Sequence, residues 1–213
     1  MKTDDFIEML ATGITAVEKN VAARRYAVAI VFGALASTLL MVASLGINPN
    51  IAQAALLAKF WIKLGFVACL AGAGLFVALR LSKPGLRLGM APFALIAPVA
   101  VMWVFALFVM GMAEPAQRMK LLLGETWVVC PILIVMLSAP IFAMVIWAMK
   151  GLAPTRLRLA GASAGLLSGA TGALVYCLHC PEMEVPFLAV WYVLGILIPT
   201  AIGALSAHRL LRW

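Results

Sequence analysis

Residues that can bind soft metals or react with oxidants lie close together in the last quarter of the chain. Cys177 and Cys180 flank His179 in the run Tyr-Cys-Leu-His-Cys-Pro-Glu over 176–182, and Glu182 adds a carboxylate. Thiolates bind soft metals and are the form of cysteine that oxidants attack, while a histidine can supply a nitrogen ligand or a nearby positive charge. The Cys-x-x-Cys spacing is a weak motif by itself, because the sequence around it has neither the second half of a zinc site nor a thioredoxin-like βαβ pattern.

The composition of the chain places these residues in a membrane protein. The 213 residues are 65% hydrophobic and 11% charged, and the mean hydropathy is +1.10, well outside the range of soluble domains. Six apolar stretches are long enough to cross a bilayer core of about 30 Å as helices. They cover 26–45, 60–79, 93–112, 127–149, 159–178 and 187–206. We therefore expect an all-α polytopic membrane protein with six transmembrane helices. The pieces between the stretches are too short for an aqueous catalytic domain, so an enzyme is not expected.

The lysines and arginines lie mainly on one side of these stretches. Of the 16, twelve lie on the side of both chain ends and four on the opposite side. Because cationic loops resist translocation, both termini are expected in the cytoplasm. The net charge of +8 then follows from topology, and we expect no direct contact with nucleic acid. The expected layout is a cytoplasmic N-terminal amphipathic helix within 1–25, a six-helix transmembrane domain over 26–206 and a cytoplasmic tail over 207–213.

This topology brings three of the four cysteines to one outer, potentially oxidising and wet surface, because Cys130 lies just inside the outer end of the fourth stretch. The three thiols could form a structural disulfide, serve as a redox or metal sensor, or have no role, and the residues alone leave these readings open. A catalytic cysteine is not expected, since no recognisable oxyanion donors accompany it. In the second stretch, Cys69 is expected as a small buried residue. Lys63 is expected to extend along the lipid to the outer interface.

The fifth stretch carries a stripe of small residues that predicts close helix packing. Its glycines recur at three- and four-residue spacing, at Gly161, Gly165, Gly169 and Gly172. No Asp or Glu lies inside any of the six stretches. That absence weighs against an ion-coupled carrier, which generally needs an ionisable group near the middle of the membrane.

The N-terminal segment predicts a short amphipathic helix. Thr3 can cap it, and the acids that follow suit the positive end of the helix dipole. Apolar residues repeat near the helical period at Phe6, Leu10, Ile14, Val17 and Val21, with Ile7 and Met9 broadening the stripe. This face needs a partner, which could be the membrane surface, the protein's own loops, or a groove in another protein. One lysine and four acids in the first eighteen residues disfavour an anionic lipid surface.

Four short segments together resemble one known family over essentially the whole chain. They are Met-Lys-Thr-Asp-Asp-Phe-Ile over 1–7, Phe-Trp-Ile-Lys-Leu over 60–64, Cys130-Pro131, and His-Cys-Pro-Glu over 179–182. No single segment is specific, but their ordered combination is similar to the NrsF family, the membrane-bound negative regulators of sigma F.

The resemblance implies an anti-sigma factor with a role in transcription regulation. Such a regulator holds an extracytoplasmic-function sigma factor at the bacterial inner membrane until heavy-metal or oxidative stress releases it. Two cysteines implicated in sensing correspond to Cys130 and Cys180, which leaves Cys177 as an additional thiol. No cofactor is implied apart from transient binding of a soft metal such as cadmium. Besides the sigma factor, the implied partners are membrane lipids. The implied sigma-binding element consists of Lys2, Thr3, Asp4, Asp5, Phe6, Ile7, Met9 and Leu10, with Phe6 standing where a smaller aliphatic residue is expected.

Two other functions stay open from the residues. One is a small metal transporter or channel that uses the same thiols as an entry site. The other is a structural membrane subunit in which a disulfide joins the outer loops. For the sensor, we expect a bundle with two packings, in which reaction of the thiols shifts the fourth span against the fifth and the glycine stripe allows the movement.

Overall fold

The protein folds into a bundle of helices. A computed structural model describes residues 3–12, 20–83 and 89–212, and within these ranges it contains helices and no strand. Six helices are long and apolar enough to cross a membrane. Five are α2 (Val21–Ser44), α4 (Ala58–Leu81), α5 (Ala91–Met112), α7 (Val129–Lys150) and α8 (Leu157–Tyr176). The sixth, Val185–Leu210, joins α9 (Val185–Phe187), a π-helical turn (Leu188–Tyr192) and α10 (Val193–Leu210). The all-α class and the six expected spans are confirmed, with ends displaced by a few residues.

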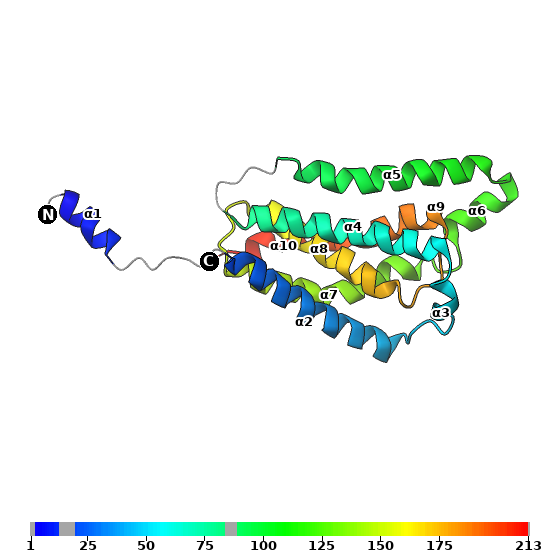
Figure 1. The fold of residues 1–213 in the computed structure, drawn as a ribbon, viewed down its shortest axis with the longest axis horizontal. Coiled ribbons are helices and arrows are strands. Elements are labelled where there is room, and N and C mark those ends of the chain that lie inside the picture. The colour runs from blue at the N-terminus through cyan, green and yellow to red at the C-terminus, as the bar shows by residue number, and fades with distance from the viewer. Residues whose placement is uncertain (1–2, 13–19, 84–88, 213) are drawn as a thin grey trace.

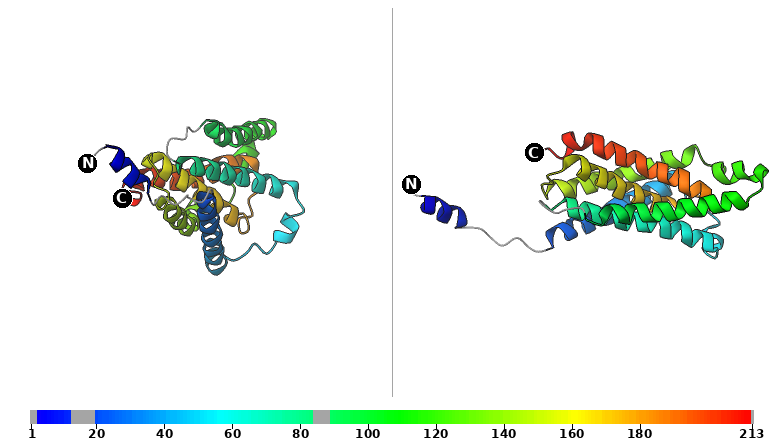
Figure 2. Two further views of the ribbon diagram at one scale, coloured as in Figure 1. Left: turned by 60° about the vertical axis from the view of Figure 1, so that its left-hand side comes forward. Right: turned by 90° about the horizontal axis from the view of Figure 1, so that it is seen from above.

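Helix α8 lies at the centre of the bundle, against α10, α7, α4 and α2 (Figures 1 and 2). Within its most apolar stretch 78% is buried, against 11% for α5, which lies at the edge of the bundle beside α4. The position of α8 follows from its composition, because small residues let several neighbouring helices approach its backbone at once. The apolar faces of α5 and α2 point outward, as expected where lipid is the solvent.

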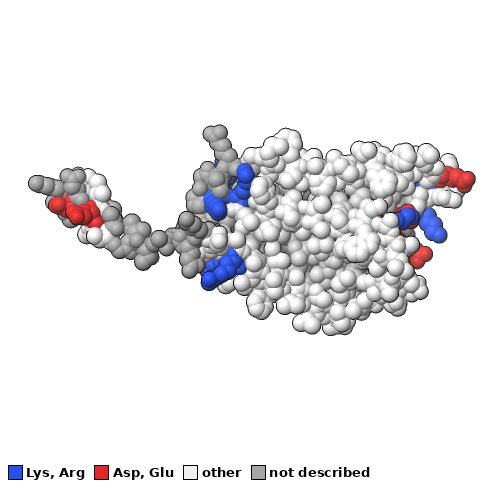
Figure 3. Space-filling view, viewed as in Figure 1, with Lys and Arg blue, Asp and Glu red and all other residues white. Residues whose placement is uncertain are grey.

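Short helices and turns connect the spans at the two ends of the bundle. At one end lie α3 (Ile51–Ala54), α6 (Pro115–Leu123) and the turn between α8 and α9, and at the other lie the start of α2 and the C-terminus (Figure 1). Most of the visible lysine and arginine side chains gather at the end with the chain termini (Figure 3). We call the end with α3 and α6 the outer end and the other the inner end.

Helix α1 (Thr3–Ala11) is separate from the bundle in Figure 1. Its Ile7 and Met9 side chains are more than half exposed. Residues 13–19 between α1 and α2, among them Ile14 and Val17, lie outside the described ranges, as does Lys2.

The contact between α8 and α10 is made by backbone against backbone. A methyl group added to Gly165 would overlap the carbonyl oxygen of Pro199, and one added to Gly161 would overlap that of Gly203. A backbone carbonyl cannot rotate away as a long side chain can, so any larger residue must force the two helices apart. The four glycines 161, 165, 169 and 172 all lie in such contacts, the last of them against Ser138 of α7.

Replacement of Gly165 by Ala is therefore expected to destabilise the folded bundle by about 1–3 kcal/mol, the usual range for overpacking. The measurement is the midpoint of thermal unfolding in detergent. Gly72→Ala on the exposed side of α4 is the matched control, because no atom lies within 4 Å of its added methyl group. An unchanged midpoint for Gly165→Ala would show that the two helices are not in contact there.

Candidate functional site: a buried thiol cluster at the outer end

Three cysteines meet at the outer end of the bundle. Cys130 is the second residue of α7, Cys177 follows the last residue of α8, and Cys180 lies in the turn beyond it. The amide of Cys180 donates to the carbonyl oxygen of Tyr176 at 3.0 Å, which closes the turn and folds it back over the end of α8. All three are free thiols, and at most 2% of each residue is exposed. The expectation that they line a wet surface is wrong, because Tyr192 and the α9 segment pack in the same apolar cluster.

Within this cluster, Cys130 and Cys180 lie within hydrogen-bonding reach of each other. A hydrogen bond from the Cys130 thiol is the largest cause of a lowered pKa for Cys180, about 5, and the nearby charge of Lys63 acts in the same direction. Burial opposes both effects. Burial instead raises the pKa of Cys177 to about 11. Cys180 therefore reaches its thiolate form at lower pH than Cys177, which favours Cys180 over Cys177 as a nucleophile.

Lys63 of α4 lies beside these thiols. The side chain is fully buried, and its Nζ donates to the carbonyl oxygens of Cys180 at 2.9 Å and Glu182 at 3.0 Å. The same Nζ lies 5.2 Å from the centroid of the Tyr192 ring. The expectation that Lys63 extends to the lipid interface is wrong, because the turn supplies carbonyl partners inside the protein. The signal in the sequence was a lysine in an otherwise apolar stretch, one helical turn after Lys59.

The carboxylate of Glu182 ties the thiol turn to the start of α7. Its Oε1 accepts hydrogen bonds from the backbone amide of Glu125 at 2.8 Å and from the Thr126 hydroxyl at 3.4 Å. Gly124, with φ +55°, packs directly against this carboxylate. Next along the turn, Glu184 forms an exposed ion pair with Lys59 at 2.7 Å. In the structure these carboxylates hold loops together, a role that the sequence did not indicate.

The imidazole of His179 is bound to a different loop. Its Nδ1 donates to the carbonyl oxygen of Gly46 at 3.0 Å, and the amide of Asn48 donates to the carbonyl oxygen of Leu178 at 3.1 Å. These bonds join the turn to the segment between α2 and α3. Among the described residues, no three His, Cys, Asp or Glu side chains are placed to hold one metal ion. The donor set that the structure brings together is the sulfur pair of Cys130 and Cys180.

Cys69 lies apart from the cluster, on the exposed side of α4. The expectation that it is buried in the bundle is wrong, since Cys69 is exposed where α4 borders α5. It lies beside a groove between α4 and α5, with Phe66 and Met102 among its other lining residues.

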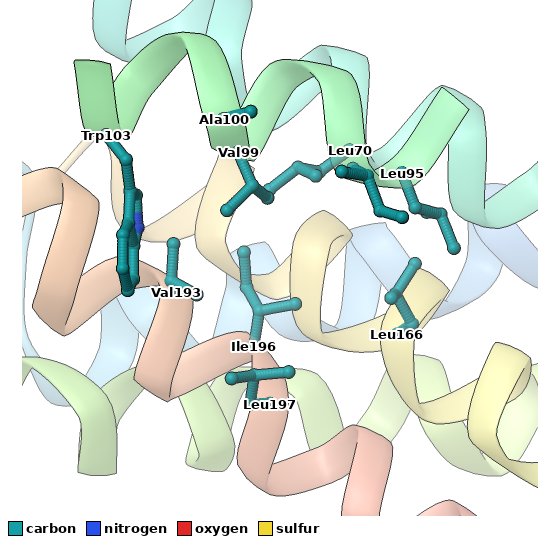
Figure 4. A pocket seen from close by; sticks show the side chains of 10 residues that line it. Leu70, Leu95, Val99, Ala100, Trp103, Leu166, Val193, Ile196 and Leu197 are labelled. Atoms are coloured by element: carbon teal, nitrogen blue, oxygen red, sulfur yellow. The ribbon is translucent and has the colours of Figure 1, made fainter. Parts of the chain in front are cut away.

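Between α5 and the centre of the bundle lies a cavity of about 350 Å³ (Figure 4). It is lined by apolar side chains, among them Leu70, Leu95, Leu166 and Ile196. Trp103 lines it too, and its indole Nε1 donates to the carbonyl oxygen of Ala189 at 3.0 Å. A lining of this kind provides no ligands for an ion, and therefore gives no support to a transport path here.

Comparison with known proteins identifies the family. The family described as negative regulator of sigma F, NrsF, matches residues 10–213. The chain belongs to the NrsF family. It is 54% identical over 213 residues to the probable anti-sigma-F factor NrsF of Azospira oryzae, and the alignment covers all of both chains. It is 38% identical over 215 residues to the anti-sigma-F factor NrsF of Caulobacter vibrioides, again over both full lengths. No solved structure matches. The resemblance found in the sequence is confirmed, and the family is one of regulators.

The lowered pKa of Cys180 gives a testable pH dependence. In a Cys69→Ser, Cys177→Ser background, the rate of Cys180 alkylation is expected to reach half its maximum near pH 5 and to be constant above about pH 7. Replacing Cys130 by Ala removes the hydrogen bond that stabilises the thiolate, so the profile should move to higher pH. The measurement is pulsed labelling between pH 4 and pH 10, read by mass spectrometry of the Cys180 peptide. If the pH dependence of Cys180 alkylation is the same in the Cys130→Ala variant, the two thiols do not interact.

Proposed function

We propose that this protein is a membrane anti-sigma factor with its thiol cluster as the sensor. Its N-terminal segment binds an extracytoplasmic-function sigma factor, and reaction of Cys130 and Cys180 with a heavy metal or an oxidant releases it. The observation that carries the binding role is the full-length identity with two anti-sigma-F factors. The observation that supports the sensing role is a buried pair of thiols at the end of the bundle opposite to the termini.

The distribution of charge supports a defined orientation in the bacterial inner membrane. Lysines and arginines occur at the inner ends of the spans, for example Arg24 near the start of α2, Lys83 just after α4, Lys150 at the end of α7 and Arg158 at the start of α8. Most of the visible ones gather at this end in Figure 3. Cytoplasmic loops carry such an excess of cations. Both termini then lie in the cytoplasm, where a sigma factor is found, and the thiols face the periplasm.

Helix α1 supports the binding role because the apolar side chains that the structure describes on it, those of Ile7 and Met9, are uncovered. Ile7 and Met9 are exposed, and an amphipathic helix of this kind can insert its apolar face into a groove of another protein. The alternative in which α1 packs on the protein's own loops is not the arrangement seen in Figure 1.

Two helices connect the thiol site with the base of the N-terminal segment. Helix α7 carries Cys130 at its outer end and Trp147 near its inner end. There the guanidinium carbon of Arg25 lies 5.5 Å from the centroid of the Trp147 ring. Helix α4 carries Lys63 near its outer end and Ala78 near its inner end. Both helices therefore reach the first turns of α2.

Tyr26, which follows Arg25 in α2, makes the contact of α2 with the inner end of α4. Its hydroxyl is hydrogen-bonded to the Ser82 hydroxyl at 2.8 Å and donates to the Ala78 carbonyl oxygen at 3.4 Å. Halfway along the bundle, the Ser37 hydroxyl donates to the carbonyl oxygen of Leu137 at 2.8 Å and joins α2 to α7. A shift of α7 would thus change the position of the residues from which the N-terminal segment extends.

The chemistry at the thiols can drive such a shift. Oxidation removes two electrons from the sulfurs of Cys130 and Cys180, together with the thiol proton that the pair carries, and forms one sulfur–sulfur bond; the oxidant accepts the electrons and the proton goes to it or to solvent. A soft metal ion instead displaces the thiol proton and is held between the two sulfurs. Either product replaces a hydrogen bond by a shorter or differently directed link between α7 and the turn. A preference of about 1–3 kcal/mol for one packing of the bundle would be enough for regulation.

The binding role is tested by placing charges on the two residues that border the apolar stripe of α1. Replacing Ile7 and Met9 together by Asp is expected to abolish co-purification of the sigma factor from membranes, since two charges cannot enter an apolar groove. Thr12→Ala, just beyond α1, is the matched control and should retain the complex. A complex that survives both the double substitution and deletion of residues 2–10 would move the binding surface to the other inner loops.

The sensing role is tested by replacing Cys130 and Cys180 with Ser, singly and together. Sigma-dependent transcription should no longer rise with cadmium or an oxidant, while repression without stress should persist. Cys69→Ser, on the exposed side of α4, is the control and should respond as the native protein does. Full induction in the double variant would refute thiol sensing and leave the anti-sigma role standing.

A further inference from the structure

We propose that Lys63 is a positioning residue of the thiol site: its buried ammonium group holds the turn from Cys180 to Glu182 against α4 and thereby keeps Cys180 beside Cys130. This inference deepens the proposed function and rests on it only in treating these two thiols as the responsive site.

The ammonium group finds its partners inside the protein. Two of its three N–H groups are directed to the carbonyl oxygens of Cys180 and Glu182, at 2.9 Å and 3.0 Å. The same nitrogen lies over the aromatic ring of Tyr192, 5.2 Å from the ring centroid. A cation over a ring face is attracted by the ring's negative charge distribution. The lysine therefore fits its surroundings as a cation without contact with water.

A salt bridge does not explain the presence of this lysine. Within the described part of the chain, no carboxylate oxygen lies within 4.0 Å of its Nζ, whereas Lys59, one turn earlier on α4, is paired with Glu184. Burying an ammonium group carries a large desolvation cost. Ionisable residues that persist inside a membrane span generally serve a function. Here the compensating partners are the turn's own carbonyl groups.

The turn depends on Lys63 because it cannot satisfy its own backbone. Residues 180–184 form no helix or strand, and Pro181, between the two carbonyl groups that Lys63 binds, has no amide N–H to donate. Buried carbonyl groups without a partner are strongly disfavoured. The ammonium group fills this gap and sets where the turn lies relative to α4. The Glu182 carboxylate sets the same turn relative to the start of α7.

The experiment compares disulfide formation in purified full-length protein in detergent. Diamide is the oxidant: it accepts two electrons from Cys130 and Cys180 and two protons, from the thiol and from water, and becomes the hydrazine while the sulfur–sulfur bond forms. The rate is followed by trapping unreacted thiols and by mass spectrometry of the linked peptides. Lys63→Met keeps the length of the side chain but removes its charge and donors. It should slow the reaction about tenfold, because unpaired carbonyl groups let the turn leave its place.

Two further variants isolate the ammonium group. Lys63→Arg retains the charge and N–H donors and should restore most of the rate, which a loss of general packing would not allow. Lys59→Met removes an exposed ion pair to the same turn and should leave the rate unchanged. If Lys63→Met does not give folded protein, Lys63→Gln, which keeps an amide donor without the charge, takes its place with the same expected direction.

Equal rates in Lys63→Met and the native protein would overturn the proposal. Equally slow reaction in Lys63→Met and Lys63→Arg would also overturn it, since the charge and donors would then not matter, and so would the absence of any disulfide in the native protein. Co-purification of the sigma factor, measured on the same variants, separates this inference from the proposed function. It should persist in Lys63→Met, because the binding segment lies at the other end, and its absence in the native protein would count against the anti-sigma role instead.

Discussion

The exclusion of water from the bilayer is the constraint on which the rest of this structure depends. A polar group inside the bundle must find its partner in the protein, and each such pair fixes which helices touch. Ser37 binds a carbonyl of α7, Tyr26 binds Ser82 beyond the end of α4, and Lys63 binds the turn after α8. These bonds are few, so each has a large effect on how the apolar helices are arranged around one another.

The same constraint decides which helices can move. Helices α8 and α10 meet backbone to backbone at Gly161 and Gly165, and a contact without side chains has no rotamers through which to adjust. These two helices therefore behave as one unit. The glycine stripe was expected to allow a slide of α7 against α8, yet most of it faces α10. Only Gly172 meets α7, near the outer end, so a movement of α7 would take place mainly against α2 and the end of α8.

The positions of the helices along the chain could be predicted from the sequence, but which helices pack against one another could not. Runs of apolar residues indicate where the spans lie, and the family was evident from short segments along the chain. In a span surrounded by lipid, however, both faces are apolar, so no periodic pattern reveals which side meets another helix. For this reason Cys69 was expected inside and lies outside, and Lys63 was expected in lipid and lies in the protein. His179 stands next to the cysteines in sequence, but its ring turns to Gly46, because only three-dimensional folding brings the loop after α2 to that side.

A sensor of this kind requires the two ends of the bundle to be coupled, and the contacts show how coupling without a long chain of polar groups can occur. A ligand or oxidant shifts an equilibrium only through a difference in free energy between two arrangements. In the proposed function, Cys130 on α7 and the turn held by α4 supply that difference at one end. At the other end, Arg25 contacts α7 and Tyr26 contacts the end of α4. A helix transmits a displacement along its axis where its own hydrogen bonds keep it rigid. This holds along α4, whereas α7 lacks one such bond at Pro140, between Cys130 and Trp147. In the proposed function, α4 and α7 thus connect the two ends of the bundle. The difference in free energy between the two arrangements then needs to arise only where these helices meet the thiols.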